Sequence, residues 1–108
     1  MILTIFRARV RPEARVEYAR LTERILELAR QTPGYLSCKD FVGADGECVT
    51  LAEFDSERAL RVWSEHREHV EAMRKARASF CLEYRIQVCS VQRGSSFPGR
   101  LSVASFGG

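Results

Sequence analysis

The sequence predicts an α+β protein with the element order β-α-β-β-α-β, which is the order of the ferredoxin-like fold. Three observations predict it. Apolar and charged residues alternate near the N-terminus, two long segments repeat apolar residues at helical spacing, and the other strand-like segments are bounded by turn or capping residues. Two split βαβ units of this kind form a four-stranded antiparallel sheet with both helices on one side.

The first strand is predicted over residues 2–10, where apolar and charged side chains alternate from Phe6 onward and so fall on opposite faces of an extended chain. Its apolar face carries Phe6, Ala8 and Val10. A helix follows from Pro12, a residue that is tolerated in a first turn, to about Arg30. One stripe of this helix keeps the i, i+3, i+4 spacing of a buried face: Val16, Ala19, Thr22, Ile25, Leu26 and Ala29. Thr32-Pro33-Gly34 ends the helix.

A hairpin is predicted next, with strands over residues 35–42 and 48–54 joined by a glycine-bounded turn over residues 43–46. Asp55-Ser56 is an N-cap signal for a second helix over residues 57–76. The apolar positions of that helix are Ala59, Leu60, Trp63, Val70 and Met73.

The fourth strand is predicted over residues 80–91, with Leu82, Tyr84, Ile86 and Val88 on one face. Apolar side chains nevertheless fall on both faces of the first and the last predicted strand. Leu3 and Ile5 oppose Ile2 and Phe6 in the first, and Cys89 and Val91 oppose Ile86 and Val88 in the last. An open sheet face that is partly apolar needs a partner, and the simplest partner is a second copy related by twofold symmetry. We therefore predict a homodimer through the open face of the sheet.

Length and charge exclude several classes of protein. The chain has 108 residues, which is one domain, and its 17 basic and 14 acidic residues are interleaved, so no nucleic-acid partner is predicted. No apolar run approaches the ~20 residues of a membrane span, and arginines interrupt the short apolar N-terminus, so neither a membrane partner nor export is predicted. We expect a cytoplasmic protein with reduced thiols, and the four cysteines form no CxxC pair that would indicate a metal site.

The composition changes after Arg93. We predict a ferredoxin-like domain over residues 1–93 and a Gly/Ser-rich C-terminal segment over residues 94–108. That segment is interpreted either as a flexible tail or as an arm exchanged with the partner subunit. The apolar residues of such an arm are Leu101, Val103 and Phe106.

Three stretches carry a more specific signal. Thr32-Pro-Gly-Tyr35 ends the first helix, Leu51-Ala-Glu-Phe-Asp-Ser-Glu-Arg-Ala-Leu60 leads into the second, and Trp63-Ser-Glu-His-Arg-Glu-His69 lies within it. With these stretches, residues 2–92 resemble the antibiotic biosynthesis monooxygenase family, whose members are dimeric α+β barrel proteins. The resemblance implies a pocket in each subunit, between the sheet and the second helix.

Some members of that family oxygenate polycyclic phenols or quinols with dioxygen and without metal or flavin. The resemblance therefore implies oxidation of a small aromatic or quinol substrate here. Trp63 would stack on the substrate, His66 or His69 would remove a phenolic proton, and Arg85 would stabilise the oxyanion. The residues predicted to bind the substrate are Phe6, Arg7 and Tyr84.

Helix geometry limits which histidine can act. Residues three apart share a helix face and are turned by about 60° from each other, so Trp63 and His66 can share one wall. His69 lies a further three positions along, about 120° from Trp63 by the same count, and joins them only if the helix is irregular.

Departures from the family pattern keep other functions open. Haem-degrading members resemble one another in having an asparagine at the position of Phe6 and a histidine at the position of Met73. This chain has neither residue at those positions, so haem is disfavoured and no cofactor is predicted. Oxygenating members have an asparagine where Ala59 stands. The alternatives are a non-catalytic dimeric module that binds a small molecule and an accessory dimerisation unit. A cavity of roughly 300 Å³ or more near Trp63 with an inward imidazole favours the first two functions, and a solidly packed Trp63 favours the last.

Overall fold

The computed structural model describes residues 1–99 and has the predicted element order, with the second helix divided in two. The strands are β1 (Ile2–Val10), β2 (Tyr35–Val42), β3 (Cys48–Phe54) and β4 (Cys81–Ser90). The helices are α1 (Arg15–Arg30), α2 (Glu57–Ser64) and α3 (Arg67–Lys75). A 3₁₀ turn at Pro12–Ala14 precedes α1, and a π-helical turn at Ala76–Phe80 follows α3.

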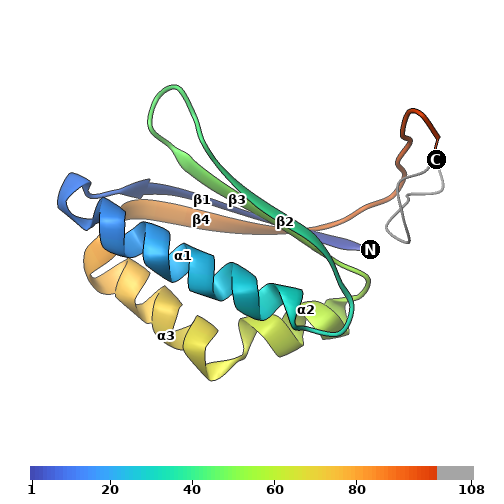
Figure 1. The fold of residues 1–108 in the computed structure, drawn as a ribbon, viewed down its shortest axis with the longest axis horizontal. Coiled ribbons are helices and arrows are strands. Elements are labelled where there is room, and N and C mark those ends of the chain that lie inside the picture. The colour runs from blue at the N-terminus through green and yellow to red at the C-terminus, as the bar shows by residue number, and fades with distance from the viewer. Residues whose placement is uncertain (100–108) are drawn as a thin grey trace.

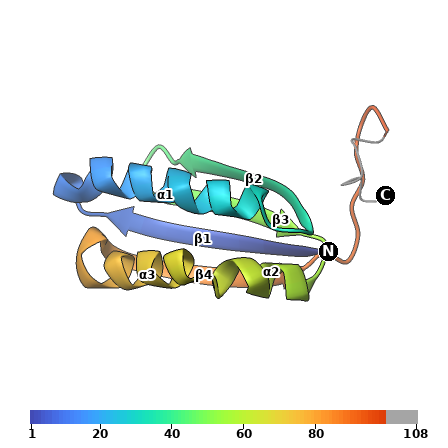
Figure 2. The same cartoon turned by 60° about the horizontal axis from the view of Figure 1, so that its bottom comes forward.

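The four strands form one antiparallel sheet in the order β2-β3-β1-β4. All three helices lie on the same side of this sheet (Figure 1), and β4 forms the edge beside α2 and α3 (Figure 2). The ferredoxin-like α+β fold that the sequence predicts is therefore confirmed.

The strand register decides which side chains meet the helices. Phe6 in β1 pairs with Thr50 in β3 and with Ile86 in β4, and these three side chains share the helix-covered face. Since neighbouring residues of a strand point to opposite faces, Arg7 and its pairing partner Arg85 lie on the open face.

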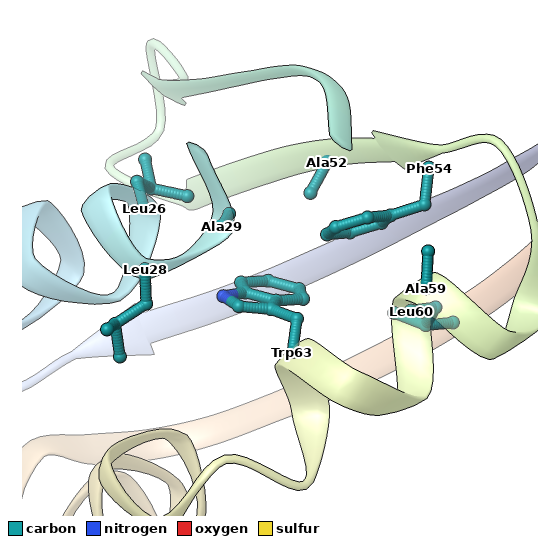
Figure 3. Close-up of a cluster of buried hydrophobic side chains, with 8 residues drawn as sticks. All are labelled: Leu26, Leu28, Ala29, Ala52, Phe54, Ala59, Leu60 and Trp63. Carbon is teal, nitrogen blue, oxygen red and sulfur yellow. The ribbon is translucent and has the colours of Figure 1, made fainter. Parts of the chain in front are cut away.

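The core consists of two clusters of buried side chains. The larger surrounds Phe54, which is fully buried, and is drawn in Figure 3: Leu26, Leu28, Ala29, Ala52, Phe54, Ala59, Leu60 and Trp63. The smaller holds Ala8, Val10, Ala14, Ala76 and Cys81. Between the two clusters the sheet and the helices enclose a space that the core does not fill.

The prediction of one continuous helix over residues 57–76 is wrong. The helix α2 ends at Ser64, and His66 has an extended backbone, with φ −60° and ψ 137°. Its Nδ1 accepts a hydrogen bond from the backbone N–H of Glu68 at 3.1 Å, which makes His66 the N-cap of α3. The side chain thus satisfies an N–H that no helical carbonyl reaches, and it allows a new helix to begin in a new direction.

Residues 91–99 follow β4. Val91 donates its backbone N–H to Met1 at 3.0 Å, which extends the β1–β4 pairing by one bond. The predicted arm residues Leu101, Val103 and Phe106 lie outside the described residues. Over residues 1–99, no helix combines the length and the apolar character that a membrane crossing requires.

Gly34 provides the first testable prediction, because it joins the end of α1 to β2 at φ +96°. A Cβ at this position would lie 2.6 Å from both Ala59 Cβ and Asp55 Oδ1, whereas one at Gly46, with φ +87°, would meet no atom within 4 Å. We expect Gly34→Ala to lower the free energy of unfolding by about 3 kcal/mol or more, because a steric clash adds to backbone strain of about 1–3 kcal/mol. Urea denaturation measures this loss.

Gly46→Ala is the matched control, since it carries the backbone strain without the clash. It should cost about 1–2 kcal/mol. Equal losses in the two variants would contradict the close packing of Gly34 against α2.

Candidate functional site

The unfilled space is a cavity of about 170 Å³ between the sheet and the helices. Its floor comes from the three strands β1, β3 and β4: Thr4, Phe6, Thr50, Ile86 and Val88. Its side walls include Tyr18, Thr22 and Ile25 of α1, Trp63 of α2, and His69 and Met73 of α3. Ile86 and Val88 are about half exposed, so the cavity opens toward the β4 edge of the sheet.

Trp63 lies at the junction of the core and this cavity. Its indole ring packs against Phe54 (Figure 3), with the ring centres 5.3 Å apart. Its Nε1–H donates to the carbonyl of Ile25 at 3.0 Å. The hydrogen bond links α2 to α1 and satisfies the indole N–H within the protein. Trp63 is therefore both a core residue and part of the cavity wall.

His69 of α3 reaches the same wall. Its ring meets the ring of Trp63 edge-on, with the centres 4.5 Å apart and the planes at 78°. Among the described residues, His69 Nδ1 is the single buried side-chain nitrogen or oxygen without a hydrogen-bond partner. His69 lines the cavity but its Nδ1 is itself covered, so a ligand hydroxyl would pair with this nitrogen after a small shift of the ring or its neighbours.

Burial also controls the charge of His69. Desolvation lowers the pKa of its imidazole below the ordinary value of 6.5, and the electrostatic influence of the neighbouring His66 lowers it further. The neutral imidazole, which can accept a proton, is therefore the form present near neutral pH.

The rest of the lining is uncharged. Within residues 1–99, no Lys, Arg, Asp or Glu side chain lines this cavity, and its polar groups apart from His69 and the indole are hydroxyls: Thr4, Tyr18, Thr22, Thr50 and Ser64. Burial raises the pKa of Tyr18 to about 12, so its phenol stays protonated at neutral pH. An apolar cavity of about 150 Å³ accommodates benzene, so this one encloses a single neutral aromatic ring, and a second fused ring would extend into its open mouth at the β4 edge. It is smaller than the 300 Å³ that the sequence-based criterion named.

Three of the seven predicted site residues line the cavity: Phe6, Trp63 and His69. His66 is exposed and caps α3. Tyr84 stacks on Phe6 with the ring centres 5.3 Å apart and accepts a hydrogen bond from Arg77 at 3.0 Å, so it supports the floor from outside the cavity.

The structure does not bring Arg7 or Arg85 to this cavity, because both lie on the open face of the sheet. Arg7 forms a two-pronged ion pair with Glu47, with both N···O distances at 3.0 Å. Arg7, Arg9 and Arg85 line a separate polar depression together with Glu47 and Glu83. The oxyanion role predicted for Arg85 has no counterpart in the lining of the Trp63 cavity.

Sequence reasoning missed the threonines of the cavity. Thr4 and Thr50 occupy inward positions of β1 and β3, and Thr22 lies in the predicted buried stripe of α1. The sequence signal that could have identified them is a polar residue at a strand or helix position that the pattern predicts to face inward. Over residues 1–99 the structure shows no group of three His, Cys, Asp or Glu side chains arranged to hold a metal ion.

Comparison with known proteins identifies relatives of this chain. The family model described as antibiotic biosynthesis monooxygenase matches residues 1–75. The uncharacterized protein YqjZ of Bacillus subtilis is 33% identical over 88 residues, which is 82% of this chain and 77% of that protein.

Two solved structures illustrate the shared fold. Rv0793 from Mycobacterium tuberculosis matches with a TM-score of 0.79 at 21% identity, over 88% of this chain and 98% of that one. SnoaB from Streptomyces nogalater, a cofactor-independent oxygenase, matches with a TM-score of 0.73 at 15% identity, over 86% of this chain and 94% of that one.

The cap at His66 gives a second prediction. We expect His66→Ala to lower the free energy of unfolding by about 0.5–2 kcal/mol, because the N–H of Glu68 loses its acceptor. His66→Asn should retain most of the stability, since asparagine is a good N-cap acceptor without an imidazole. Chemical denaturation of the three proteins checks this, and equal losses in both variants would refute the capping role.

Proposed function

The chain belongs to the antibiotic biosynthesis monooxygenase family, and on that premise we propose that it is a monooxygenase of a small, neutral phenol or quinol. Dioxygen would be the oxidant, and neither metal nor flavin would take part. The observation that carries this proposal is the unpartnered, buried Nδ1 of His69 beside Trp63 in a neutral, apolar cavity. SnoaB, which shares the fold, is a cofactor-independent oxygenase.

The proposed binding mode follows from the lining. A flat aromatic ring would enter from the β4 edge and lie among Phe6, Trp63 and Met73. Its hydroxyl group would donate a hydrogen bond to His69 Nδ1, which has no other partner among the described residues. A carboxylate or phosphate on the substrate would lose its hydration in this cavity without a cation to pair with. That desolvation costs roughly several kcal/mol per ion, so the proposed substrate is neutral.

The reaction starts with the phenolic proton. The neutral imidazole of His69 takes that proton, and the resulting phenolate transfers one electron to dioxygen. The phenoxyl radical and superoxide then combine, which forms a C–O bond at the ring carbon para to the hydroxyl. The imidazolium of His69 returns its proton to the outer peroxide oxygen.

Loss of the proton from that ring carbon and cleavage of the O–O bond complete the reaction. One oxygen atom remains in the para-quinone and the other leaves as water. The substrate supplies all the electrons that reduce dioxygen, so no external reductant is needed. The chemistry requires that the ring carbon para to the hydroxyl carries a hydrogen atom. α-Naphthol meets this condition.

A haem group fits this site poorly. Met73 lines the cavity with a thioether. Haem-degrading relatives resemble one another in having a histidine at this position. The cavity of about 170 Å³ lies below the range of about 300–1,000 Å³ that drug-sized ligands occupy, and a haem macrocycle is at least of that size. No step of the proposed reaction uses it.

Oxygen uptake with α-naphthol tests the proposal. We expect uptake above the autoxidation rate, and we expect His69→Gln to reduce it by about a hundredfold or more, because a general base contributes 10²–10⁴-fold. The rate should hold as pH falls to 6.5 and decline only below it, since burial lowers the pKa of the base from that value. The variant should lose this acid limb.

Arg67→Gln is the control for this test, because Arg67 is exposed on the same helix and lies outside the cavity lining. Unchanged uptake in His69→Gln would contradict the assignment of the base. Binding of α-naphthol without any uptake would instead identify a non-catalytic small-molecule-binding module.

We further propose that a second copy of the chain covers the open face of the sheet. At its centre Ile5 pairs with Leu51, and Leu3 and Val49 lie diagonally beside them. Such an apolar centre, bordered by the Arg7–Glu47 ion pair, is suited to a twofold interface.

Analytical ultracentrifugation tests this interface. We expect a mass of twice 12.3 kDa for the wild-type chain and of one chain for Leu51→Asp, because the new carboxylate would be buried without a partner. Val42→Asp is the matched control, since Val42 is 72% exposed on the opposite face of the neighbouring strand. A monomeric wild-type chain at micromolar concentration would refute the interface.

A further inference from the structure

Tyr18 of α1 stands between two cavities. The first is the Trp63 cavity of about 170 Å³. The second, of about 330 Å³, lies between α1 and the strands β2 and β3, and it is lined by Arg15, Asp40 and Cys48 among others. The two linings share three residues, Tyr18, Thr22 and Thr50, which therefore form the partition between the cavities.

Tyr18 is the one large member of that partition. Thr22 lies one turn further along α1, and Thr50 lies below on β3. Neither threonine has the volume to fill the space that the tyrosine ring occupies, so the ring is what keeps the cavities apart.

The ring of Tyr18 is held in place by core packing. It packs against the smaller core cluster, which includes Ala8, Val10 and Ala76. Its hydroxyl stays protonated at neutral pH, because burial raises the pKa of Tyr18 to about 12. The partition therefore acts through its shape and not through a charge.

The opposite ends of the two cavities are open. The Trp63 cavity opens at the β4 edge beside Ile86 and Val88. The second cavity reaches the exposed side chains of Phe41 and Val42 at the end of β2. Without the tyrosine ring, one groove would run beneath α1 from one edge of the sheet toward the other.

We propose that Tyr18 is a specificity-determining residue, which limits the substrate to one or two fused rings by closing the inner end of the Trp63 cavity. The proposal rests on the proposed function, because it concerns the substrate of that site. The two volumes together come to about 500 Å³, which lies within the range of pockets for larger ligands. Replacing Tyr18 by a small residue would join them and admit three linearly fused rings.

Ligand binding under anaerobic conditions tests this proposal independently of catalysis. Calorimetry would compare α-naphthol, which has two fused rings, with anthrone, which has three. We expect the wild-type chain to bind α-naphthol at least about tenfold more tightly, because a closed pocket rejects a larger ligand by steric exclusion. We expect Tyr18→Ala to gain about tenfold or more in affinity for anthrone.

Three further variants control for folding and for a general enlargement of the site. Tyr18→Leu retains packing against the smaller core cluster and should also gain affinity for anthrone, to a smaller extent. Tyr18→Phe retains the ring and should behave as the wild-type chain does. Leu21→Ala enlarges the Trp63 cavity without opening the second, because Leu21 lines only the first.

The outcomes separate this proposal from the function on which it rests. If folded Tyr18→Ala and Tyr18→Leu bind anthrone no better than Leu21→Ala does, the role of Tyr18 is overturned. It is also overturned if the wild-type chain does not bind α-naphthol. A gain in anthrone affinity without oxygen uptake by any of these proteins would support the partition and refute the monooxygenase.

Discussion

The contacts of the Trp63 indole hold the helical layer together, and the rest of the structure depends on them. One ring face packs on Phe54 of β3, the N–H donates to Ile25 of α1, and the ring meets His69 of α3 edge-on. Elements far apart in the sequence thus converge on a single side chain. Because the same side chain borders the cavity, the position of the proposed base is fixed by the packing of the core.

The interruption between α2 and α3 is what allows this convergence. In a continuous helix His69 would be turned by about 120° from Trp63. The extended backbone at His66 starts α3 on a new axis, and an ion pair between Arg24 and Glu68, at 2.8 Å, links the first turn of α3 to α1. An exposed ion pair adds little stability, but together with the cap it defines where α3 begins.

Periodicity, turn chemistry and the family resemblance together predicted the fold. The second half of the α1 stripe, with Leu26 and Ala29, is buried as its spacing indicates, whereas Val16 at its start is exposed. The site could be predicted only in part. Trp63 and His69 came from a local motif, yet the geometry that joins them depends on a helix break that a continuous apolar pattern conceals. Phe6 and Arg7 were assigned together, although neighbours in a strand face opposite ways. Thr50 and Tyr18 line the same cavity only through tertiary packing, which no local pattern reports.

The cavity also has a meaning for the evolution of the chain. At roughly 24 cal/mol per Å³, an unfilled volume of about 170 Å³ corresponds to at most about 4 kcal/mol, since its mouth is open to water. Small domains are stable by only about 5–15 kcal/mol, so this is a large share of the total. Substituting a larger residue at Ala72, whose small side chain lines the cavity, would make the protein more robust and close its site. Selection for heat resistance therefore favours a smaller cavity, whereas selection for turnover favours keeping it open.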